Sequence, residues 1–409
     1  MNEEPGKGGP VLVALNAKFI HTAMAVYSLQ AYAAAKGIDI PVCEFTINQP
    51  QDLMIKELYR MHPCVAAFSI YIWNASETWS LIRAFHELLP ETEIWVGGPE
   101  VTYQAEKVLL EHPEVTGLMR GEGEETFLEL CRLWKNDREI REGLKRIKGI
   151  TFRTEAGIFA APTRELLKMD SIPFPYRNLE LLSGRILYYE SSRGCPFSCV
   201  YCLSSVEKTV RFKQTDRVKQ ELKRFLDADV KQVKFVDRTF NCNRSHTMEI
   251  WKYLLEHDNG ITNFHFEISG DLLGDEEIAL LAQARPGYFQ FEIGVQSTNP
   301  ETLKQIRRQT DLMKLAENIR KLRQAKNIHL HLDLIAGLPE EDYERFALSF
   351  NEVYRMQPSQ LQLGFLKVLS GSEMFQMISQ CHVRHKIDPP YEVLSTRWLS
   401  YDDLIRLIE

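Results

Sequence analysis

Three cysteines, Cys195, Cys199 and Cys202, lie close together near the middle of the chain in the spacing C-x3-C-x2-C. They follow the apolar run 186–189, which predicts a strand, so we expect them in the loop at its carboxyl end. Three thiolates on one short loop can converge on a soft metal centre such as an iron–sulfur cluster. A four-iron cluster with three protein ligands keeps one iron open, and open positions are where metal sites do chemistry.

Two other uses of cysteine stay open. Free cysteine is among the most buried residue types, and this is what we expect for most of the other five. A structural zinc ion would need a fourth ligand, yet no histidine lies between His112 and His246. Cys242 could supply that ligand only from a distant loop, or its thiol could serve a reaction. The other five cysteines are Cys43, Cys64, Cys131, Cys242 and Cys381.

Composition narrows the class of protein. The 409 residues suffice for two domains, and 44% hydrophobic with 26% charged residues is typical of a globular protein. A net charge of −7 argues against a general nucleic-acid binder. No apolar run is long enough to cross a bilayer, and the amino terminus lacks a hydrophobic signal core. We therefore expect a cytoplasmic protein, without a membrane partner, whose cysteines stay reduced.

The amino-terminal half alternates short apolar runs with amphipathic segments, which predicts a doubly wound, Rossmann-like α/β domain over residues 1–145. Such a sheet binds ligands at the carboxyl ends of its strands. A hairpin and a proline-rich linker are expected over 146–180. The predicted strands are 11–15, 41–47, 65–69, 93–96 and 117–119, and the predicted helices are 24–36, 51–60, 77–89, 105–111 and 124–134.

The alternation restarts after the linker and predicts a partial (β/α)6 barrel over residues 181–370, because a closed eight-stranded barrel typically needs about 250 residues. A carboxyl-terminal extension, 371–409, has no assignable role, and its end in mid-helix pattern indicates a truncated chain. The predicted strands are 186–190, 232–236, 263–268, 288–293, 329–335 and 361–365, and the predicted helices include 216–227, 245–257, 275–284, 300–307 and 311–326.

The cysteine loop resembles the signature of the radical S-adenosylmethionine (SAM) enzymes, which has an aromatic residue before the last cysteine, here Tyr201. In that family the three cysteines hold a [4Fe-4S] cluster whose open iron binds the amino and carboxylate groups of SAM. The later strand ends F-V-D-R-T-F-N (235–241), F-E-I-S-G-D (266–271), E-I-G-V-Q-S (292–297) and D-L-I-A-G-L-P (333–339) also resemble family motifs. The SAM contacts that this resemblance implies are Tyr201, Asp237, Glu267, Ser269, Gln296, Gly337 and Leu338.

Residues 10–140 resemble the cobalamin-binding domain of B12-dependent radical SAM enzymes, through V-G-G-P (96–99) and G-E-G-E (121–124). The D-x-H-x-x-G motif of domains that ligate cobalt by histidine is absent, since 16–21 reads N-A-K-F-I-H. The resemblance therefore implies cobalamin without a histidine ligand, its lower face covered by the loop 69–74, or a domain that has lost cobalamin. The implied contacts are Ser69, Tyr71, Trp73, Asn74, Gly97, Gly98, Pro99, Glu100, Val101, Gly121, Glu122, Gly123 and Glu124.

Together these resemblances imply an enzyme that reductively cleaves SAM and methylates or rearranges an unreactive carbon of a small-molecule or peptide substrate. Such an enzyme takes its electrons from an external donor of the flavodoxin or ferredoxin type. One alternative is a tRNA methylthiotransferase-like enzyme, which needs three more cluster cysteines where only Cys43, Cys64 and Cys131 are available. The other is a non-catalytic cobalamin- or redox-sensing module.

A basic run follows the cysteine loop, and it favours a solvated helix face over a site for an anionic substrate. The run consists of Lys208, Arg211, Lys213, Arg217, Lys219, Lys223 and Arg224.

Overall fold

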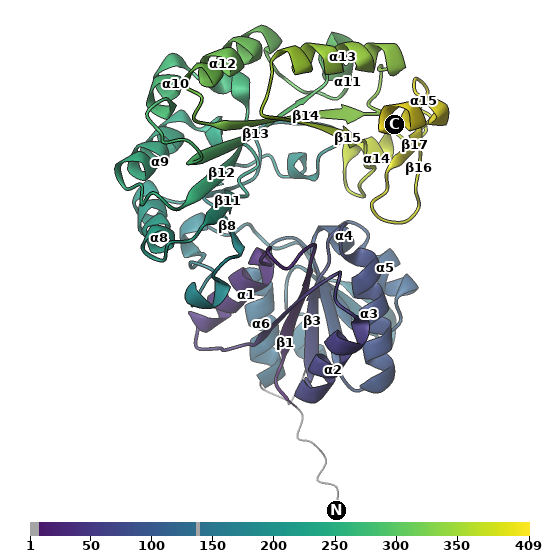
Figure 1. Cartoon of the computed structure of the whole chain (residues 1–409). Helices are drawn as coiled ribbons and strands as arrows, with labels where there is room; N and C mark the ends of the chain where they lie inside the picture. The colour runs from purple at the N-terminus through teal and green to yellow at the C-terminus, as the bar shows by residue number, and fades with distance from the viewer. Residues whose placement is uncertain (1–7, 136–139) are drawn as a thin grey trace, which may run out of the picture. The chain divides into compact units, whose positions relative to one another are not determined.

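The computed structural model describes residues 8–135 and 140–409, and the chain divides into two compact units, Met1–Arg185 and Ile186–Glu409 (Figure 1). Each unit is built on its own sheet of mainly parallel strands. The α/β class and the order of the two folds expected from the sequence are thus confirmed.

The sheet of the first unit has the strand order β2-β1-β3-β4-β5-β6-β7. The first five strands are parallel, and β6 and β7 add an antiparallel hairpin at one edge. The order 2-1-3-4-5 reverses direction between β1 and β3, which is where doubly wound sheets bind their ligands. The strands are β1 (Val11–Asn16), β2 (Val42–Thr46), β3 (Val65–Ser69), β4 (Glu93–Gly97), β5 (Gly117–Met119), β6 (Ile150–Thr154) and β7 (Gly157–Ala160).

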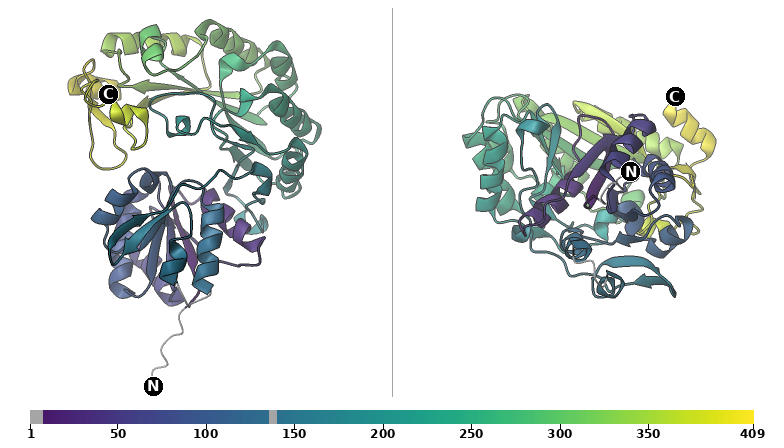
Figure 2. Two further views of the ribbon diagram at one scale, coloured as in Figure 1. Left: turned by 180° about the vertical axis from the view of Figure 1, so that it is seen from behind. Right: turned by 90° about the horizontal axis from the view of Figure 1, so that it is seen from below.

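Helices cover both faces of this sheet (Figures 1 and 2), because the apolar residues of its central strands are buried on both sides. Val13 enters a core with residues of α2, α3 and α5, whereas its neighbour Leu12 enters a second core with residues of α1 and α6. This two-sided burial is what a run such as Val11–Leu15 predicts. The helices are α1 (Met24–Ala34), α2 (Gln51–Met61), α3 (Ala75–Leu88), α4 (Pro99–Thr102), α5 (Ala105–Glu111), α6 (Glu124–Lys135) and α7 (Ile140–Leu144).

The second unit holds six parallel strands in the order β15-β14-β13-β12-β11-β8. Among the described strands no pairing joins β15 back to β8, so the sheet is an open, partial barrel as expected. Parallel strands bring all their carboxyl ends to one edge, where barrels of this kind carry their chemistry. The strands are β8 (Ile186–Tyr189), β11 (Gln232–Phe235), β12 (Asn263–Ile268), β13 (Phe289–Gln296), β14 (His329–Ala336) and β15 (Gln360–Phe365).

The two faces of this sheet differ sharply in chemistry. Phe235, Phe266 and Phe291 point toward the helix layer and are fully buried. Trp251 of α9 packs on Phe291, with 5.7 Å between the ring centroids. Alternate residues such as Lys234 and Glu292 face the inner side and are polar. Helices lie along the apolar side (Figure 1). They are α8 (Thr215–Asp227), α9 (Arg244–Glu256), α10 (Asp275–Leu281), α11 (Pro300–Gln305), α12 (Leu312–Ala325) and α13 (Tyr343–Arg355).

The carboxyl-terminal extension, to which the sequence assigned no role, is folded. It contains α14 (Glu373–Gln376), the hairpin of β16 (Arg384–His385) and β17 (Val393–Ser395), and α15 (Tyr401–Ile408). A second short hairpin, β9 (Ser192–Arg193) with β10 (Arg211–Phe212), encloses the cysteine loop.

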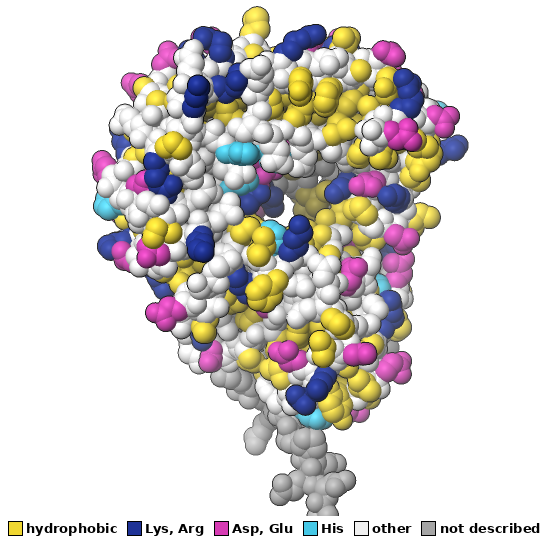
Figure 3. Space-filling model, in the orientation of Figure 1, with side chains coloured by type: hydrophobic (Ala, Val, Ile, Leu, Met, Phe, Trp, Pro, Cys, Tyr) yellow, Lys and Arg dark blue, Asp and Glu magenta, His cyan; other side chains and the backbone are white. Residues whose placement is uncertain are grey.

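The surface of the molecule carries no visible block of one charge. In the space-filling view, basic and acidic side chains are interspersed over the visible face of each unit (Figure 3). No helix in the described part of the chain is long and apolar enough to span a membrane.

Glu44 on β2 holds the carboxyl edge of the first sheet together. Its buried carboxylate accepts hydrogen bonds from Asn16 Nδ2 (2.7 Å), Ala23 N (2.6 Å) and Tyr27 OH (2.8 Å). Arg185 Nη1 forms an ion pair with the same carboxylate at 2.6 Å, and Arg185 Nη2 donates to the carbonyl of His21. One carboxylate therefore fixes the whole loop that follows β1.

Replacing Glu44 by alanine is expected to lower the free energy of unfolding of the first unit by about 3 kcal/mol, because it leaves the largely buried Arg185 charge without its carboxylate partner. Urea unfolding followed by circular dichroism measures the effect. The exposed Glu57→Gln on α2 serves as control and should shift stability by no more than about 0.5 kcal/mol. Equal effects of the two substitutions would contradict this account of Glu44.

Candidate functional site

The three cysteines of the C-x3-C-x2-C loop line one pocket at the carboxyl edge of the second sheet. The pocket also receives side chains from the ends of β11, β12, β13 and β14, so five consecutive strand ends meet there. Its lining residues are Cys195, Phe197, Cys199, Tyr201, Cys202, Ser204, Arg238, Thr239, Glu267, Ile268, Ser269, Glu292, Gly294, Gln296, Arg308, Gln309 and Asp333.

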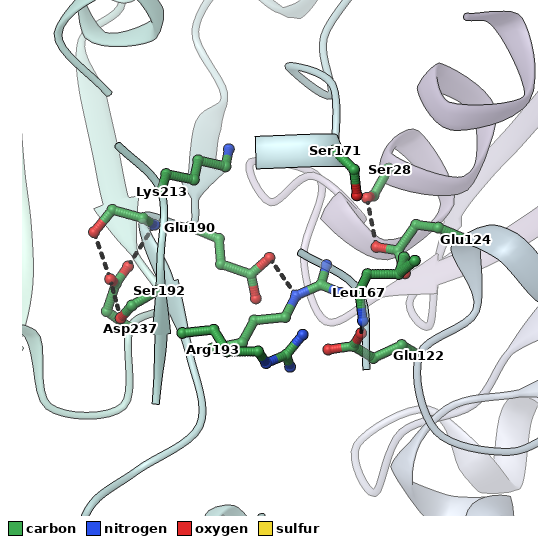
Figure 4. Close-up of polar contacts among 12 residues, drawn as sticks. Ser28, Glu122, Glu124, Leu167, Ser171, Glu190, Ser192, Arg193, Lys213 and Asp237 are labelled. Atoms are coloured by element: carbon green, nitrogen blue, oxygen red, sulfur yellow. Dashed lines mark hydrogen bonds and ion pairs between the residues drawn. The ribbon is translucent and has the colours of Figure 1, made fainter. Parts of the chain in front are cut away.

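Buried polar contacts fix the entry to the cysteine loop. Asp237, at the end of β11, accepts hydrogen bonds from Ser191 N (3.0 Å), Ser191 Oγ (2.6 Å) and Ser192 Oγ (2.6 Å). Figure 4 shows the Asp237 carboxylate against Ser192, and Glu190 paired with Arg193 at 2.8 Å. The strand ends of β8 and β11 are thereby locked together just before Cys195.

Arg308 connects the cysteine loop with β13. Its Nη1 lies 4.0 Å from Cys199 Sγ and 3.4 Å from the Tyr201 hydroxyl, and its Nη2 donates to the Gly294 carbonyl. Burial raises the pKa of the Cys199 thiol, and the positive charge of Arg308 opposes this rise. A cation beside Cys199 thus favours the thiolate, which is the form that binds metals.

Gln296 has a strained backbone at the mouth of β13. Its φ is +71°, and the pairing of β13 with β14 shifts by one residue between Gly294 and Gln296. Such bulges re-aim side chains and are concentrated next to active sites. The Oε1 of Gln296 is buried without a hydrogen-bond partner among the described residues, so it offers an acceptor to a bound ligand.

The inner wall of the pocket carries three carboxylates of different character. Lys234 Nζ and His265 Nε2 each lie 3.0 Å from the Glu292 carboxylate. The hydrogen bond with His265, followed by the charge of Lys234, lowers the pKa of Glu292 to about 2, although burial alone would raise it. Burial raises the pKa of Glu267, which lies 3.9 Å from Lys234. Burial, then the charges of Glu292 and Glu267, raise the pKa of Asp333 to about 7. The wall therefore holds one firm anion and two acids that retain protons more readily.

The structure gathers some of the predicted SAM contacts and not others. Tyr201, Glu267, Ser269 and Gln296 line the pocket with the cysteines. Asp237, Gly337 and Leu338 do not line it, and their predicted SAM contacts stay predictions that the pocket lining does not support. Asp237 is 1% exposed and serves the serines of the β8 end, Leu338 is fully buried in a core, and a Cβ on Gly337 would meet Val393 at 2.8 Å.

Sequence reasoning missed Arg308, Asp333 and Arg238, of which Asp333 and Arg238 lie within or close to a recognised strand end and Arg308 does not. Asp333 could have been found, because it begins the D-L-I-A-G-L-P segment on the same face as Ile335. Arg308 follows α11 in a turn, and nothing in its local sequence indicates contact with Cys199.

The side chains of the pocket fit a metal cluster better than a single metal ion. Within residues 8–135 and 140–409, no group of three or more His, Cys, Asp or Glu side chains is arranged to hold a metal ion. The three cysteines nevertheless line one pocket, which suits a polynuclear cluster whose thiolates bind separate irons. Three thiols, a nearby guanidinium and an unsatisfied amide oxygen thus fit an iron–sulfur cluster together with a polar ligand.

The remaining cysteines do not form a second cluster site. Cys43 and Cys131 are buried in cores on opposite faces of the first sheet, which is the packing role expected of them. Cys381 is 1% exposed in a core of the second unit. Cys242 lies in a 3-10 turn after β11, outside the pocket lining, and burial raises its pKa to about 11. A methylthiotransferase-type second cluster would require Cys43 and Cys131 to converge.

The carboxyl edge of the first unit presents an aromatic surface. Tyr71 and Trp73, in the loop after β3, stack with 4.3 Å between ring centroids and 14° between planes, and Trp73 is 48% exposed. Asn74 supports this loop from beneath, since its Nδ2 donates to Leu15 O (2.9 Å) and to Ser69 O (3.2 Å). Asn74 is 1% exposed and braces the surface from within, and its predicted cobalamin contact stays a prediction.

Glycine is needed at the end of β4 for close backbone packing. Gly98 has φ +114°, and a Cβ there would collide with the Ile70 carbonyl, so close backbone packing already requires glycine. Gly97 ends β4 and is buried, whereas Pro99 and Glu100 open the short helix α4 at the sheet edge. Val101 is fully buried and its side chain belongs to the core, and its predicted ligand contact stays a prediction.

The G-E-G-E loop after β5 is tied to its own unit (Figure 4). Glu122 accepts a hydrogen bond from Leu167 N (3.0 Å), and the buried Glu124 accepts one from Ser28 Oγ (2.9 Å). Both carboxylates therefore have protein partners. Gly121, with φ +74°, faces open space, and Gly123 lies close to Leu29, so the glycine backbone is the part of this loop that can approach a ligand.

His21 follows β1 in a loop held by its backbone. Its carbonyl accepts hydrogen bonds from Asn16 Nδ2 (3.0 Å) and Arg185 Nη2 (2.6 Å). These contacts explain the position of His21 without a metal. The open edge, with the aromatic pair and a bare glycine backbone, suits a large flat ligand that needs no histidine.

The basic run after the cysteine loop is engaged in ion pairs. Lys213 and Arg217 both bind Glu221, at 2.8 and 3.0 Å, and Lys219 and Lys223 have acidic partners as well. Lys213 is almost fully buried. The predicted solvated helix face fits Lys223 and Arg224 of α8, which are exposed, but not Lys213, which precedes α8 and is buried.

Comparison with known proteins places both units in described families. Residues 189–353 match the family model of the radical SAM superfamily, and residues 10–131 match that of the B12 binding domain. Relatives include the uncharacterized methyltransferase PH0819 of Pyrococcus horikoshii, 26% identical over 69% of this chain and 62% of the relative. The cobalamin-dependent radical SAM methyltransferase TokK of Streptomyces tokunonensis is 26% identical over 70% of this chain and 44% of the relative. The chain thus spans less than two thirds of either relative.

Solved structures show the same fold. The radical SAM methyltransferase TsrM of Kitasatospora setae, solved with cobalamin and a [4Fe-4S] cluster, superposes with a TM-score of 0.76 at 14% identity. The match covers 94% of this chain and 82% of TsrM. At this identity the likeness is one of architecture.

The raised pKa of Asp333 predicts a pH-dependent stability. An acid whose pKa is about 7 when folded and about 4 when unfolded binds protons more tightly in the folded state, so folding weakens as pH rises between these values. The free energy of unfolding of the wild type, measured relative to that of Asp333→Asn, should fall between about pH 4 and about pH 7 and stay constant at higher pH. Urea unfolding across this range checks it, and a flat or opposite trend would contradict it.

Proposed function

Because the chain belongs to the radical SAM proteins that carry a B12-binding domain, we propose that it reductively cleaves SAM and uses cobalamin to methylate or rearrange an unreactive carbon. The observation that carries the proposal is the single pocket in which three cysteines meet five strand ends. A small molecule or peptide is the proposed substrate, and an external flavodoxin- or ferredoxin-type protein the proposed electron donor.

Cys195, Cys199 and Cys202 would hold a [4Fe-4S] cluster through three irons and leave the fourth open to SAM. When bound, the cluster supplies the electron that breaks a carbon–sulfur bond of SAM, and cobalamin supplies a methyl carrier. Arg308 would hold the cluster loop against β13 and keep a positive charge beside Cys199. This charge would stabilise the anionic thiolate–cluster unit.

The remaining pocket residues would bind and orient SAM. The unsatisfied Oε1 of Gln296 offers an acceptor for a hydroxyl or an amino group. Ser269 is held by a reciprocal pair of contacts with Asn241, 2.8 and 2.9 Å long, so its side chain is presented from a rigid strand end. Glu267 would complete the polar wall. Rigid placement of this kind lowers the cost of ordering the ligand.

Cobalamin would lie at the carboxyl edge of the first sheet. The stacked Tyr71 and Trp73 offer it a flat apolar surface, and the glycines of the β4 and β5 ends allow close approach of the backbone. No histidine is needed in this arrangement, because the β1 loop that carries His21 is held through its backbone.

Anaerobic reconstitution with iron and sulfide tests the cluster. The wild type should bind about four irons per chain and, with a chemical reductant, convert SAM to 5′-deoxyadenosine or a methylated product. Cys199→Ala should abolish both, whereas Cys64→Ala in the other unit should change neither. Uptake of one zinc and no iron would overturn the proposal, and a bound cluster without SAM turnover would favour a sensing module.

Titration with hydroxocobalamin tests the second cofactor. Absorbance spectra should show binding by the wild type, and Trp73→Ala should weaken it roughly three- to tenfold through loss of stacking. Leu88→Ala, at the opposite edge of the sheet, is the matched control, and His21→Ala should leave the spectrum unchanged. A wild type that does not bind, or loss of binding in His21→Ala, would contradict the proposed corrin site.

A further inference from the structure

We propose that the carboxyl-terminal extension, residues 371–409, helps to form the iron–sulfur site, because Met374 positions the cysteine loop through Val200. The inference rests on the proposed function, because it concerns the loop that would hold the cluster. It assigns a role to the segment that the sequence left without one.

Val200 lies between two of the three cysteines and is held from both sides. Its N–H donates to the Ile306 carbonyl at 3.1 Å, and its carbonyl accepts a hydrogen bond from Met374 N at 2.8 Å. The Ile306 contact comes from the end of α11, and the Met374 contact comes from the first turn of α14. The backbone next to Cys199 is therefore pinned between the barrel and the extension.

The side chains of Val200 and Met374 also connect the cysteine loop with the extension. Val200 is 1% exposed and Met374 is fully buried, and both belong to one apolar core formed largely by the extension. The core of buried residues consists of Val200, Leu303, Ile306, Leu338, Leu366, Val368, Met374, Cys381, Val383, Val393, Leu399 and Leu404. Within it, Val200 is the buried member drawn from the cysteine loop, and the partly buried Tyr201 packs against the same core. The loop thus has an apolar anchor whose partners lie mostly beyond β15.

The start of α14 is itself fixed in place. Ser372 is 1% exposed, donates through Oγ to Leu369 O (2.6 Å) and accepts from Phe375 N (3.3 Å), which caps the helix. Glu373 forms an ion pair with Arg307 at 2.6 Å, adjacent to the Arg308 that reaches Cys199. Met374 is therefore presented to Val200 from a rigid turn.

The same core explains why the residues that follow β14 do not line the pocket. Gly337 and Leu338 come directly after β14, and Val393 of β17 packs so closely there that a Cβ on Gly337 would meet its side chain at 2.8 Å. Val393 N also donates to Leu366 O at 2.8 Å. Extension, β14 end and cysteine loop form one packed body, so a change in the extension is felt at the cysteines.

Met374→Ala tests this coupling. It removes the contact with Val200 while keeping the backbone hydrogen bond, and outer-shell contacts of this kind typically change metal affinity about tenfold or more. We expect iron release to a chelator, measured anaerobically on the reconstituted protein, to be about tenfold faster than in the wild type. The electron paramagnetic resonance spectrum of the reduced cluster should change as well. Met374→Leu, which conserves volume, should restore both.

Leu322→Ala is the matched control, because Leu322 is equally buried in α12 on the outer helix layer. It should lower the unfolding midpoint to a similar extent yet leave iron release and the spectrum unchanged.

Equal iron release by Met374→Ala and Leu322→Ala, or a wild-type spectrum in Met374→Ala, would overturn the inference. If Met374→Ala does not fold, iron release and the spectrum are measured in the milder Val200→Ala, which truncates the partner side chain in the cysteine loop. A wild type that takes up no cluster would instead refute the proposed function. The two failures are therefore distinguishable.

Discussion

The second unit depends on the alternation of buried and less buried residues along its parallel strands. Residues such as Phe235, Phe266 and Phe291 bury against the helix layer, and this fixes the register, since a slip of one residue would reverse both faces. The intervening residues, including Lys234 and Glu292, are then forced onto the inner face although they carry charge. The same register brings five strand ends to one edge with the cysteine loop. A closed barrel would fill this space with branched aliphatic side chains.

The candidate site is held by buried groups that do not themselves line the pocket. Asp237 ties the end of β8 to that of β11, Asn241 fixes Ser269, and Val200 anchors the cysteine loop in the core of the extension. In the first unit, Glu44 and Asn74 do the same for the loops after β1 and β3. Loops that would otherwise be mobile are thereby fixed without using the side chains that face a ligand.

The sequence predicted the fold closely, because hydrophobic periodicity and glycine turns are local signals. Ala105–Glu111 and Asn263–Ile268 have the predicted bounds, and the cysteine loop follows β8 as expected. The roles of single residues were harder to predict. Asp237 and Leu338 lie in strand-end motifs but serve buried contacts, and Arg308 reaches Cys199 across 109 residues. Such long-range contacts leave no local pattern, and so the proposed ligand roles of Glu267, Ser269 and Gln296 stay predictions.

The central claim is that Cys195, Cys199 and Cys202 leave one iron of a [4Fe-4S] cluster open to SAM. Pulsed electron paramagnetic resonance of the anaerobically reduced protein, with SAM carrying 15N in its amino group or 17O in its carboxylate, tests it most directly. The account predicts hyperfine coupling of the label to the cluster. A reduced cluster whose spectrum is identical with and without labelled SAM would contradict it.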